Sequence, residues 1–173
     1  MEGTGLADDA FKGRKSEEVH KLRAQALNII RKELKDKMPA ISLCLPVNPD
    51  IGFDDKALAV IKAMKNENVP VDTISIMAMD YGANYIPKGF YENTINSLEK
   101  SYEQSRAIYP NVKMGVIPMI GQNDDGSILT LKDTENICVI RCDFKYFGGI
   151  VLAIVTIFEE SGEEEEEEDE EDL

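Results

Sequence analysis

The stretch that decides the fold is Ile76-Met77-Ala78-Met79-Asp80-Tyr81-Gly82, an apolar run of strand character that ends in an acid, an aromatic and a glycine. A buried strand that stops on polar groups is typical of a site at the carboxyl edge of an α/β sheet. Two other apolar runs end in the same way, one in Pro46-Val47-Asn48-Pro49 and one in the segment 121–126. We therefore expect three strand ends to bring an acid, a phenol and amides to one edge.

Helical and strand-like patterns alternate along the chain. Apolar residues at helical spacing predict helices over 16–37, from Asp54 onward, near 90–108 and over 131–139. Continuous apolar or β-branched runs predict strands over 40–47, 71–79, 113–120 and 149–158. Short connections between alternating helices and strands predict an α/β fold with a parallel sheet wrapped by helices.

Side-chain periodicity also predicts which faces are buried. In the first helix the expected buried stripe consists of Val19, Leu22, Ala26, Ile30 and Leu34. In the second helix Asp54 and Asp55 are expected to cap the start, with Leu58, Ile61 and Met64 facing inward. The third helix carries Tyr91, Ile95, Leu98 and Tyr102 in step.

Charge divides the chain into a body and a tail. The 173 residues are 43% hydrophobic and carry a net charge of −14. Glu159, Glu160 and the run from Glu163 to Asp172 hold so many of the acids that the remaining body is nearly neutral. We expect one domain over 1–158 and a disordered acidic tail over 159–173, which either only solubilises the protein or binds basic partners. The body offers no basic stripe for nucleic acid.

The composition gives little support for metal or triad chemistry. The three cysteines, Cys44, Cys138 and Cys142, lack the spacing of a zinc site, and His20 is the only histidine. No glycine-rich phosphate loop is present. We expect no cofactor and no metal. No leader pattern opens the chain, and 149–158 is too short to span a bilayer, so we expect no membrane partner and leave the location open.

Three segments resemble strands of a known enzyme family. Residues 41–47, 76–82 and 115–124 are similar, in this order, to strands five, six and seven of family-18 glycoside hydrolases, in the microbial-type chitinase branch. The resemblance covers about 2–135 and implies a partial (β/α)8 TIM barrel, from about strand four or five to strand eight. It implies chitin or N-acetylglucosamine oligomers as ligands. If the N-terminus of this sequence is incomplete, the resemblance also implies that the protein is secreted.

The resemblance also implies a catalytic acid. Met1-Glu2-Gly3 resembles the end of the family's fourth-strand D-x-x-D-x-D-x-E signature, so Glu2 would protonate the glycosidic oxygen while the substrate's own acetamido group attacks the anomeric carbon. The aspartates of that signature and strands one to three would lie before residue 1. Glu2 alone lacks their preorganisation, and an ordinary terminal acid remains the alternative.

The same resemblance assigns substrate-binding residues. Asp80 falls on the carboxylate that holds the acetamido group, Met79 stands where many relatives have tyrosine, and Tyr81 would supply a phenol one residue later. Gln122 and Asn123 would line the cleft; as an alternative, these polar residues only form turns.

The chain departs from the family after about Val139 and has no tryptophan to stack under a sugar. We therefore expect a chitinase-like fragment that has no activity of its own. The activity of its ancestor would be the hydrolysis of β-1,4-linked N-acetylglucosamine in chitin. The alternative is a non-catalytic sugar-binding remnant or an interaction protein that uses the acidic tail. We also expect self-association through open sheet edges.

Overall fold

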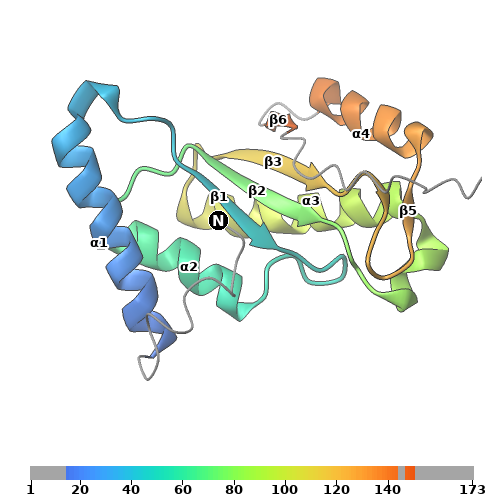
Figure 1. Cartoon of the computed structure of the whole chain (residues 1–173), viewed down its shortest axis with the longest axis horizontal. Coiled ribbons are helices and arrows are strands. Elements are labelled where there is room, and N and C mark those ends of the chain that lie inside the picture. Colours follow the sequence, from blue (N-terminus) through green and yellow to red (C-terminus); the bar gives the residue numbers. More distant parts are fainter. Residues whose placement is uncertain (1–14, 144–146, 151–173) are drawn as a thin grey trace, which may run out of the picture.

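The computed structural model describes residues 15–143 and 147–150, and the side chains of residues 15–138. Helices and strands alternate as predicted, with two short 3₁₀ helices and a small hairpin added (Figure 1). The elements are α1 (Ser16–Leu34), η1 (Lys35–Lys37), β1 (Ser42–Pro46), α2 (Asp55–Asn66), β2 (Thr73–Ala78), η2 (Ala83–Lys88), α3 (Phe90–Ile108), β3 (Lys113–Pro118), β4 (Gly121–Gln122), β5 (Ile128–Leu129), α4 (Leu131–Asp143) and β6 (Phe147–Ile150).

The main sheet is parallel, and its strands follow the order of the chain, β1-β2-β3-β6. The register sets Cys44 beside Ser75 and Ser75 beside Gly115. Helices α2, α3 and α4 each return the chain from one strand of this sheet to the next. All polar strand ends therefore lie on one edge of the sheet, as the sequence predicts.

One face of the sheet carries the hydrophobic core. Ile74, Ile76 and Val116 are completely buried there and pack with side chains from every helix from α1 to α4, including Ile61 and Leu98. Because the helices share this one core, successive crossovers all return on the same side of the sheet. This arrangement differs from a doubly wound sheet, in which the crossovers cover both faces.

The other face of the sheet carries a smaller cluster. Met79, Ile117 and Met119 are buried on it, and Cys44 and Met77 pack against them. Ser75 is also buried at 0% exposure. Both faces of β2 are therefore withdrawn from solvent, which is the reason for its uninterrupted run of apolar and small residues.

The caps and ends of the helices follow local sequence chemistry. The Asp54 carboxylate accepts the Ala57 N–H at 2.8 Å, which confirms the predicted cap of α2. Ile61 and Met64 are buried as expected, whereas Leu58 is only partly buried. The third helix has the predicted bounds, and of its predicted stripe Leu98 is completely buried and Ile95 and Tyr102 pack against the core, whereas Tyr91 is exposed. Small polar residues such as Ser97 and Ser101 share the buried face of this helix.

The predicted buried stripe of the first helix is wrong for most of its members. Only Val19 of that stripe is buried, while Leu22, Ile30 and Leu34 are exposed. The helix turns a different face toward α2, centred on Ala24, which is completely buried. The last predicted strand, 149–158, begins earlier, at Phe147, and its part beyond Ile150 lies outside the described residues, as do Glu2 and the acidic tail.

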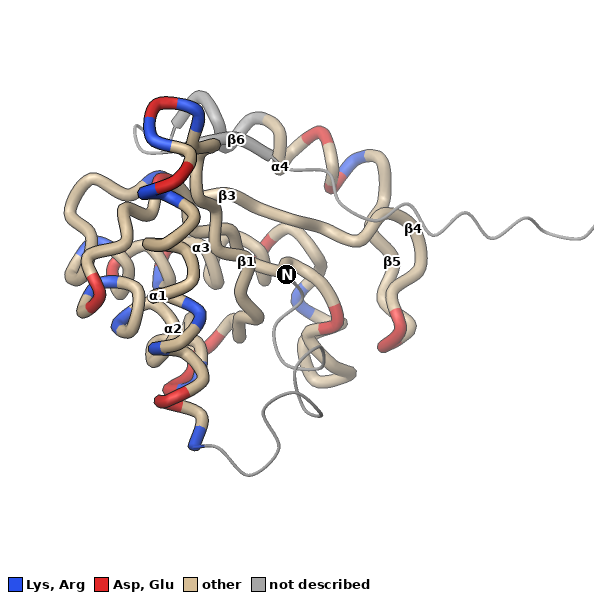
Figure 2. Tube along the Cα trace, turned by 60° about the vertical axis from the view of Figure 1, so that its left-hand side comes forward, with Lys and Arg blue, Asp and Glu red and all other residues tan. Residues whose placement is uncertain are grey.

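Charged residues are distributed without a large field of one sign. Figure 2 shows basic and acidic positions mixed along α1 and α2, and acidic positions at the turn between β4 and β5. In the described part of the chain, no helix is long and apolar enough to cross a membrane.

Candidate functional site

The ends of β2 and β3 meet at the carboxyl edge of the sheet. The Asp80 N–H donates to Asn123 Oδ1 at 3.3 Å, and the Asp125 N–H donates to Asp80 Oδ1 at 3.3 Å. Asp80 lies two residues after Ala78, the last residue of β2, and has φ of 50°, a value that non-glycine residues rarely adopt. The structure thus brings together Asp80 and Asn123, two residues that the sequence places on the same site.

Asn123 and Asp80 have different environments. Asn123 is 3% exposed, and its Nδ2 donates to the carbonyls of Met119 at 3.3 Å and Gly121 at 3.4 Å. Asp80 is exposed, and among the described residues no donor lies on its Oδ2. Asn123 therefore fixes the backbone of Asp80, while the second carboxylate oxygen of Asp80 faces solvent.

Asp125 ties the β4–β5 turn to the segment after β2. Its carboxylate accepts the Gly82 N–H at 2.8 Å, and it accepts both the N–H of Ser127 at 2.9 Å and its hydroxyl at 2.5 Å. Burial acts to raise the pKa of this carboxyl, but the bonds from Ser127 and Gly82 outweigh burial and lower the pKa below its usual value. Asp125 therefore remains a carboxylate and holds two loops that are 43 residues apart.

Tyr81 points away from this edge. Its hydroxyl lies 3.4 Å from the Thr94 hydroxyl, and its ring packs 5.9 Å from the ring of Phe90 at the start of α3. Burial raises the pKa of the Tyr81 phenol to about 12, although the hydrogen bond with Thr94 opposes this shift. Tyr81 thus anchors η2 and α3 on the core, and the structure does not bring its hydroxyl to Asp80.

The other expected site residues lie in different places. Met79 belongs to the smaller apolar cluster, with Ile117 and Met119, on the face of the sheet opposite the main core. Gln122 is exposed in β4, where it pairs with Ile128 across the hairpin. Glu2 lies outside the described residues.

A polar network at the ends of β1 and β2 is not evident from the sequence. The Tyr85 hydroxyl donates to Asp50 Oδ2 at 2.8 Å and accepts the Asn48 Nδ2 donor at 3.1 Å, while Lys88 lies 3.7 Å from Asp50. The bond from Tyr85, helped by Lys88 and Lys100, lowers the pKa of the Asp50 carboxyl. Tyr85 lies in a 3₁₀ segment that carries no periodic signal, so only its contacts reveal this role.

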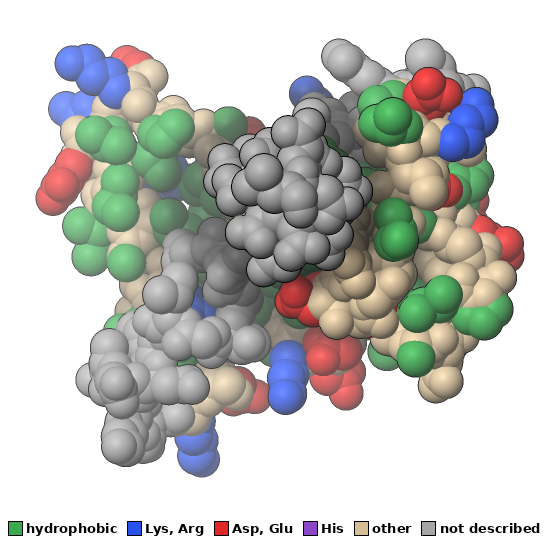
Figure 3. Space-filling model, turned by 45° about the vertical axis from the view of Figure 1, so that its right-hand side comes forward, with side chains coloured by type: hydrophobic (Ala, Val, Ile, Leu, Met, Phe, Trp, Pro, Cys, Tyr) green, Lys and Arg blue, Asp and Glu red, His purple; other side chains and the backbone are tan. Residues whose placement is uncertain are grey.

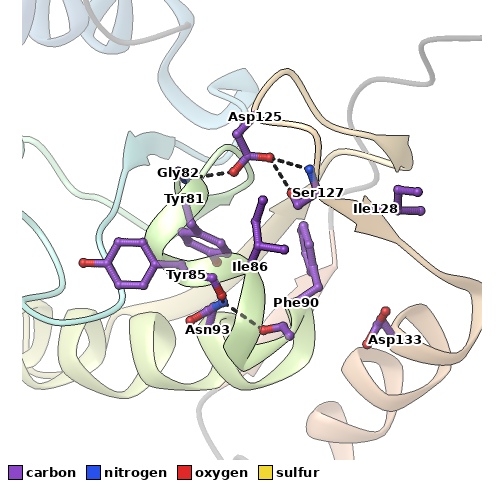
Figure 4. A pocket seen from close by; sticks show the side chains of 11 residues that line it. Tyr81, Gly82, Tyr85, Ile86, Phe90, Asn93, Asp125, Ser127, Ile128 and Asp133 are labelled. Carbon is purple, nitrogen blue, oxygen red and sulfur yellow. Dashed lines mark hydrogen bonds between the residues drawn. The ribbon is translucent and has the colours of Figure 1, made fainter.

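A shallow cleft of about 160 Å³ opens beside the Asp125 turn. Figure 4 shows Asp125 above it, held to Gly82 and Ser127, with Ile86 and Phe90 between Asp125 and Asn93. Aromatic and aliphatic walls next to carboxylates and amides suit a small ligand with hydroxyl groups. Among the described residues, no group of three or more His, Cys, Asp or Glu side chains is placed to hold a metal ion.

The solved structures that this chain resembles are chitinases. A scan of protein-family models finds no match, and a search of curated proteins finds none either. The catalytic domain of a hyperthermophilic chitinase from Pyrococcus furiosus, a set of catalytic-site mutants of its active domain 2, and such mutants complexed with chito-oligosaccharides each match with 29% identity and a TM-score of 0.63. Each match covers 81% of this chain and 45% of the solved chain. The chain thus has a chitinase-like α/β fold and spans less than half the length of those structures.

Proposed function

We propose that this chain is the strand-five-to-eight part of a family-18 glycoside hydrolase barrel and that its carboxyl edge binds β-1,4-linked N-acetylglucosamine oligomers. The observation that carries the proposal is the Asp80–Asn123 hydrogen bond at the ends of two adjacent parallel strands. Strand order follows chain order and all crossovers return on one face, as in one half of a (β/α)8 barrel. The likeness to chitinases, including one complexed with chito-oligosaccharides, supports the ligand class.

The environments of the edge residues suggest separate roles in sugar binding. The exposed carboxylate of Asp80 accepts hydrogen bonds from the acetamido N–H or a hydroxyl of the sugar. Asn123 is buried and saturated, so it positions Asp80 and does not contact sugar. Met79, in the smaller apolar cluster, provides contact for a sugar's methyl group, and Gln122 offers amide groups from β4. Tyr81 acts as an anchor beneath the site.

The direct test is binding of chitotriose to the full 173-residue chain, measured by calorimetry or by amide shifts. Asp80→Asn removes the charge while it keeps the shape, and a bond to a charged group contributes about 1.5–3 kcal/mol. We expect about 10- to 100-fold weaker binding. Asp124→Asn is the matched control, because Asp124 is an exposed acid in the adjoining β4–β5 turn whose side chain makes no hydrogen bond to the described residues. Equal affinities for both variants, or no binding by folded protein, reject the sugar site.

Catalysis is tested separately with a fluorogenic chitobiose conjugate. We expect no turnover by the isolated chain, because a lone Glu2 acid has no neighbouring aspartates to orient the acetamido group or tune its pKa. Turnover that is abolished by Glu2→Gln would instead establish an active glycosidase. The non-catalytic alternative is separated by chitin pull-down with and without residues 159–173. Retention that needs this acidic segment assigns binding to the tail and not to the cleft.

A further inference from the structure

The cleft beside the Asp125 turn adjoins the edge that carries Asp80 but is distinct from it. Three segments line the cleft: η2 with the start of α3, the β4–β5 hairpin, and the first turn of α4. Asp80 does not line it, whereas Asp125 takes part in both places. The Asp125 N–H donates to Asp80 Oδ1 at 3.3 Å, and Asp125 also lines the cleft. A ligand in the cleft would therefore lie one turn away from a ligand on Asp80.

The walls of the cleft are apolar, and its rim is open to solvent. Phe90 is buried at the start of α3, while Ile86 is 43% exposed on η2 and Ile128 is 59% exposed on β5. Figure 4 shows Ile86 and Phe90 at the centre of the cleft and Ile128 at its side. Figure 3 turns this end of the molecule forward and shows hydrophobic side chains exposed on it. Such walls can pack against the C–H groups of a small ring.

The side-chain donors of the cleft are all used within the chain. Among the described lining residues, the side chains with an N–H or O–H donor are Tyr81, Tyr85, Asn93 and Ser127. Their acceptors, in the same order, are the Thr94 hydroxyl at 3.4 Å, Asp50 Oδ2 at 2.8 Å, the carbonyls of Tyr85 at 2.7 Å and Gly89 at 2.9 Å, and Asp125 Oδ1 at 2.5 Å. The Thr94 hydroxyl gives its own hydrogen to the Phe90 carbonyl, which leaves it as the acceptor for Tyr81. These side chains therefore offer no donor to an anionic ligand.

Acceptors and negative charge remain available in the cleft. Asp133 Oδ2 accepts the N–H and the hydroxyl of Thr130, while no described residue donates to its Oδ1. Asn93 is 2% exposed, and its Oδ1 accepts no hydrogen bond from the described residues. Asp125 and Asp133 both line the cleft, and none of the described lining residues is Lys, Arg or His. The cleft therefore suits a ligand with a positively charged N–H donor.

We propose that this cleft binds a glucosamine unit, a 2-amino sugar whose amine is free and protonated. The ammonium group donates hydrogen bonds to the carboxylates that line the cleft, and the apolar side of the sugar ring packs against Phe90 and Ile128. The choice of a sugar rests on the proposed function, because the cleft adjoins Asp80 across one turn. The preference for a cation rests on the lining of the cleft alone.

Such a subsite distinguishes partly deacetylated chitin from fully acetylated chitin. An N-acetyl group carries no charge, so in the cleft it loses the attraction of Asp125 and Asp133. Both acids are partly exposed to solvent, which weakens an ion pair. We therefore expect an amine at carbon 2 to improve binding by about three- to tenfold over a hydroxyl group. An oligomer with N-acetylglucosamine at Asp80 and glucosamine in the cleft should bind more tightly than chitotriose.

Three monosaccharides that differ only at carbon 2 test the cleft: glucosamine, N-acetylglucosamine and glucose. Each is titrated into the full 173-residue chain at matched chloride concentration, and backbone amide shifts are followed. We expect the amides of Ser127, Ile128 and Asp133 to shift, with a dissociation constant for glucosamine about three- to tenfold below that for glucose. Because the acidic segment 159–173 attracts any cation, only shifts at the cleft count. Equal constants for glucosamine and glucose overturn the proposal.

Two lysine substitutions form a matched pair of variants. Ile128→Lys brings an ammonium group to the cleft, where it competes with the ligand's own, so the preference for glucosamine over glucose should disappear. Leu131→Lys adds the same charge nearby, at a residue that is 84% exposed and does not line the cleft, so the preference should remain. Both changes replace an exposed side chain and should leave the fold intact. An equal loss in the two variants assigns the effect to overall charge and overturns the proposal.

Removal of charge gives a second matched pair. Asp133→Asn keeps an oxygen that can accept the Thr130 N–H, and we expect it to lower the preference for glucosamine. Glu135→Gln removes the same charge from the same helix, at a residue outside the cleft whose ion pair with Lys132 is exposed, and should leave the preference unchanged. A preference that survives Asp133→Asn in full overturns the proposal.

The sugar edge at Asp80 and the cleft can fail separately. Binding of chitotriose without any preference for glucosamine rejects the amine subsite and leaves the proposed function intact. A preference for glucosamine at the cleft, in a protein that does not bind chitotriose, rejects the sugar edge at Asp80 and supports the cleft as a site for an amine.

Discussion

Replacing Asp125 by alanine should loosen the whole carboxyl edge of the sheet. Its carboxylate accepts bonds from the Gly82 N–H and from the N–H and hydroxyl of Ser127. Bonds to charged groups contribute about 1.5–3 kcal/mol each, but they are not additive here because they share one partly exposed acceptor. We expect Asp125→Ala to lower the free energy of unfolding by about 2–3 kcal/mol. For a chain of this length the melting temperature falls by about 5–10 °C.

Urea unfolding at neutral pH measures this loss, with Asp124→Ala as the matched control in the same turn. The lowered pKa of the Asp125 carboxyl adds a pH dependence. The stabilisation is present above the unfolded value near 3.8 and is lost as pH falls through the lower folded value, so the two curves should converge in acid. A loss below about 0.5 kcal/mol, or unchanged exchange of the Gly82 amide, would refute the reasoning.

Two further predictions concern a buried phenol and a crowded glycine. Because burial raises the pKa of Tyr81 to about 12, the native protein should lose up to about 2–3 kcal/mol relative to Tyr81→Phe between pH 10 and 12, measured by denaturant unfolding. If the unfolding free energies of the native protein and of Tyr81→Phe change equally between pH 10 and 12, the burial of the Tyr81 phenol is contradicted. A Cβ at Gly52, with φ of 76°, would lie 2.5 Å from Gln104 Oε1, which accepts the Phe53 N–H, and 3.1 Å from the backbone carbonyl carbon of Lys100, so Gly52→Ala should cost about 2 kcal/mol or more. Gly126→Ala, with φ of 84° and open space around it, should cost only about 1 kcal/mol of backbone strain, and equal losses would refute the close approach.

Most of the secondary structure was predictable because the local signals were strong. The third helix, 90–108, and the cap at Asp54 follow from helical spacing and from a side chain that accepts a neighbouring N–H. The hairpin of β4 and β5 and the segment η2 were missed, because two-residue strands and 3₁₀ turns have no periodicity to detect.

The site was predictable only in part, for a geometric reason. The sequence correctly places Asp80 and Asn123 at neighbouring strand ends, since parallel strands end on one edge. It does not show which way a side chain turns after the strand. Asp80 adopts positive φ, and Tyr81 then points back to Thr94 in the core. The link between Tyr85 and Asp50 joins loops 35 residues apart, and no local pattern encodes it.

The sequence by itself determined the alternation of helices and strands, the polar strand ends and the uneven charge, because these depend on periodicity and on residue type. Only the tertiary structure decided which face of α1 is buried, because that depends on what α2 offers and not on the helix's own stripe. It also decided that Asn123 supports Asp80 from a buried position, since burial and hydrogen-bond saturation arise only when distant loops meet.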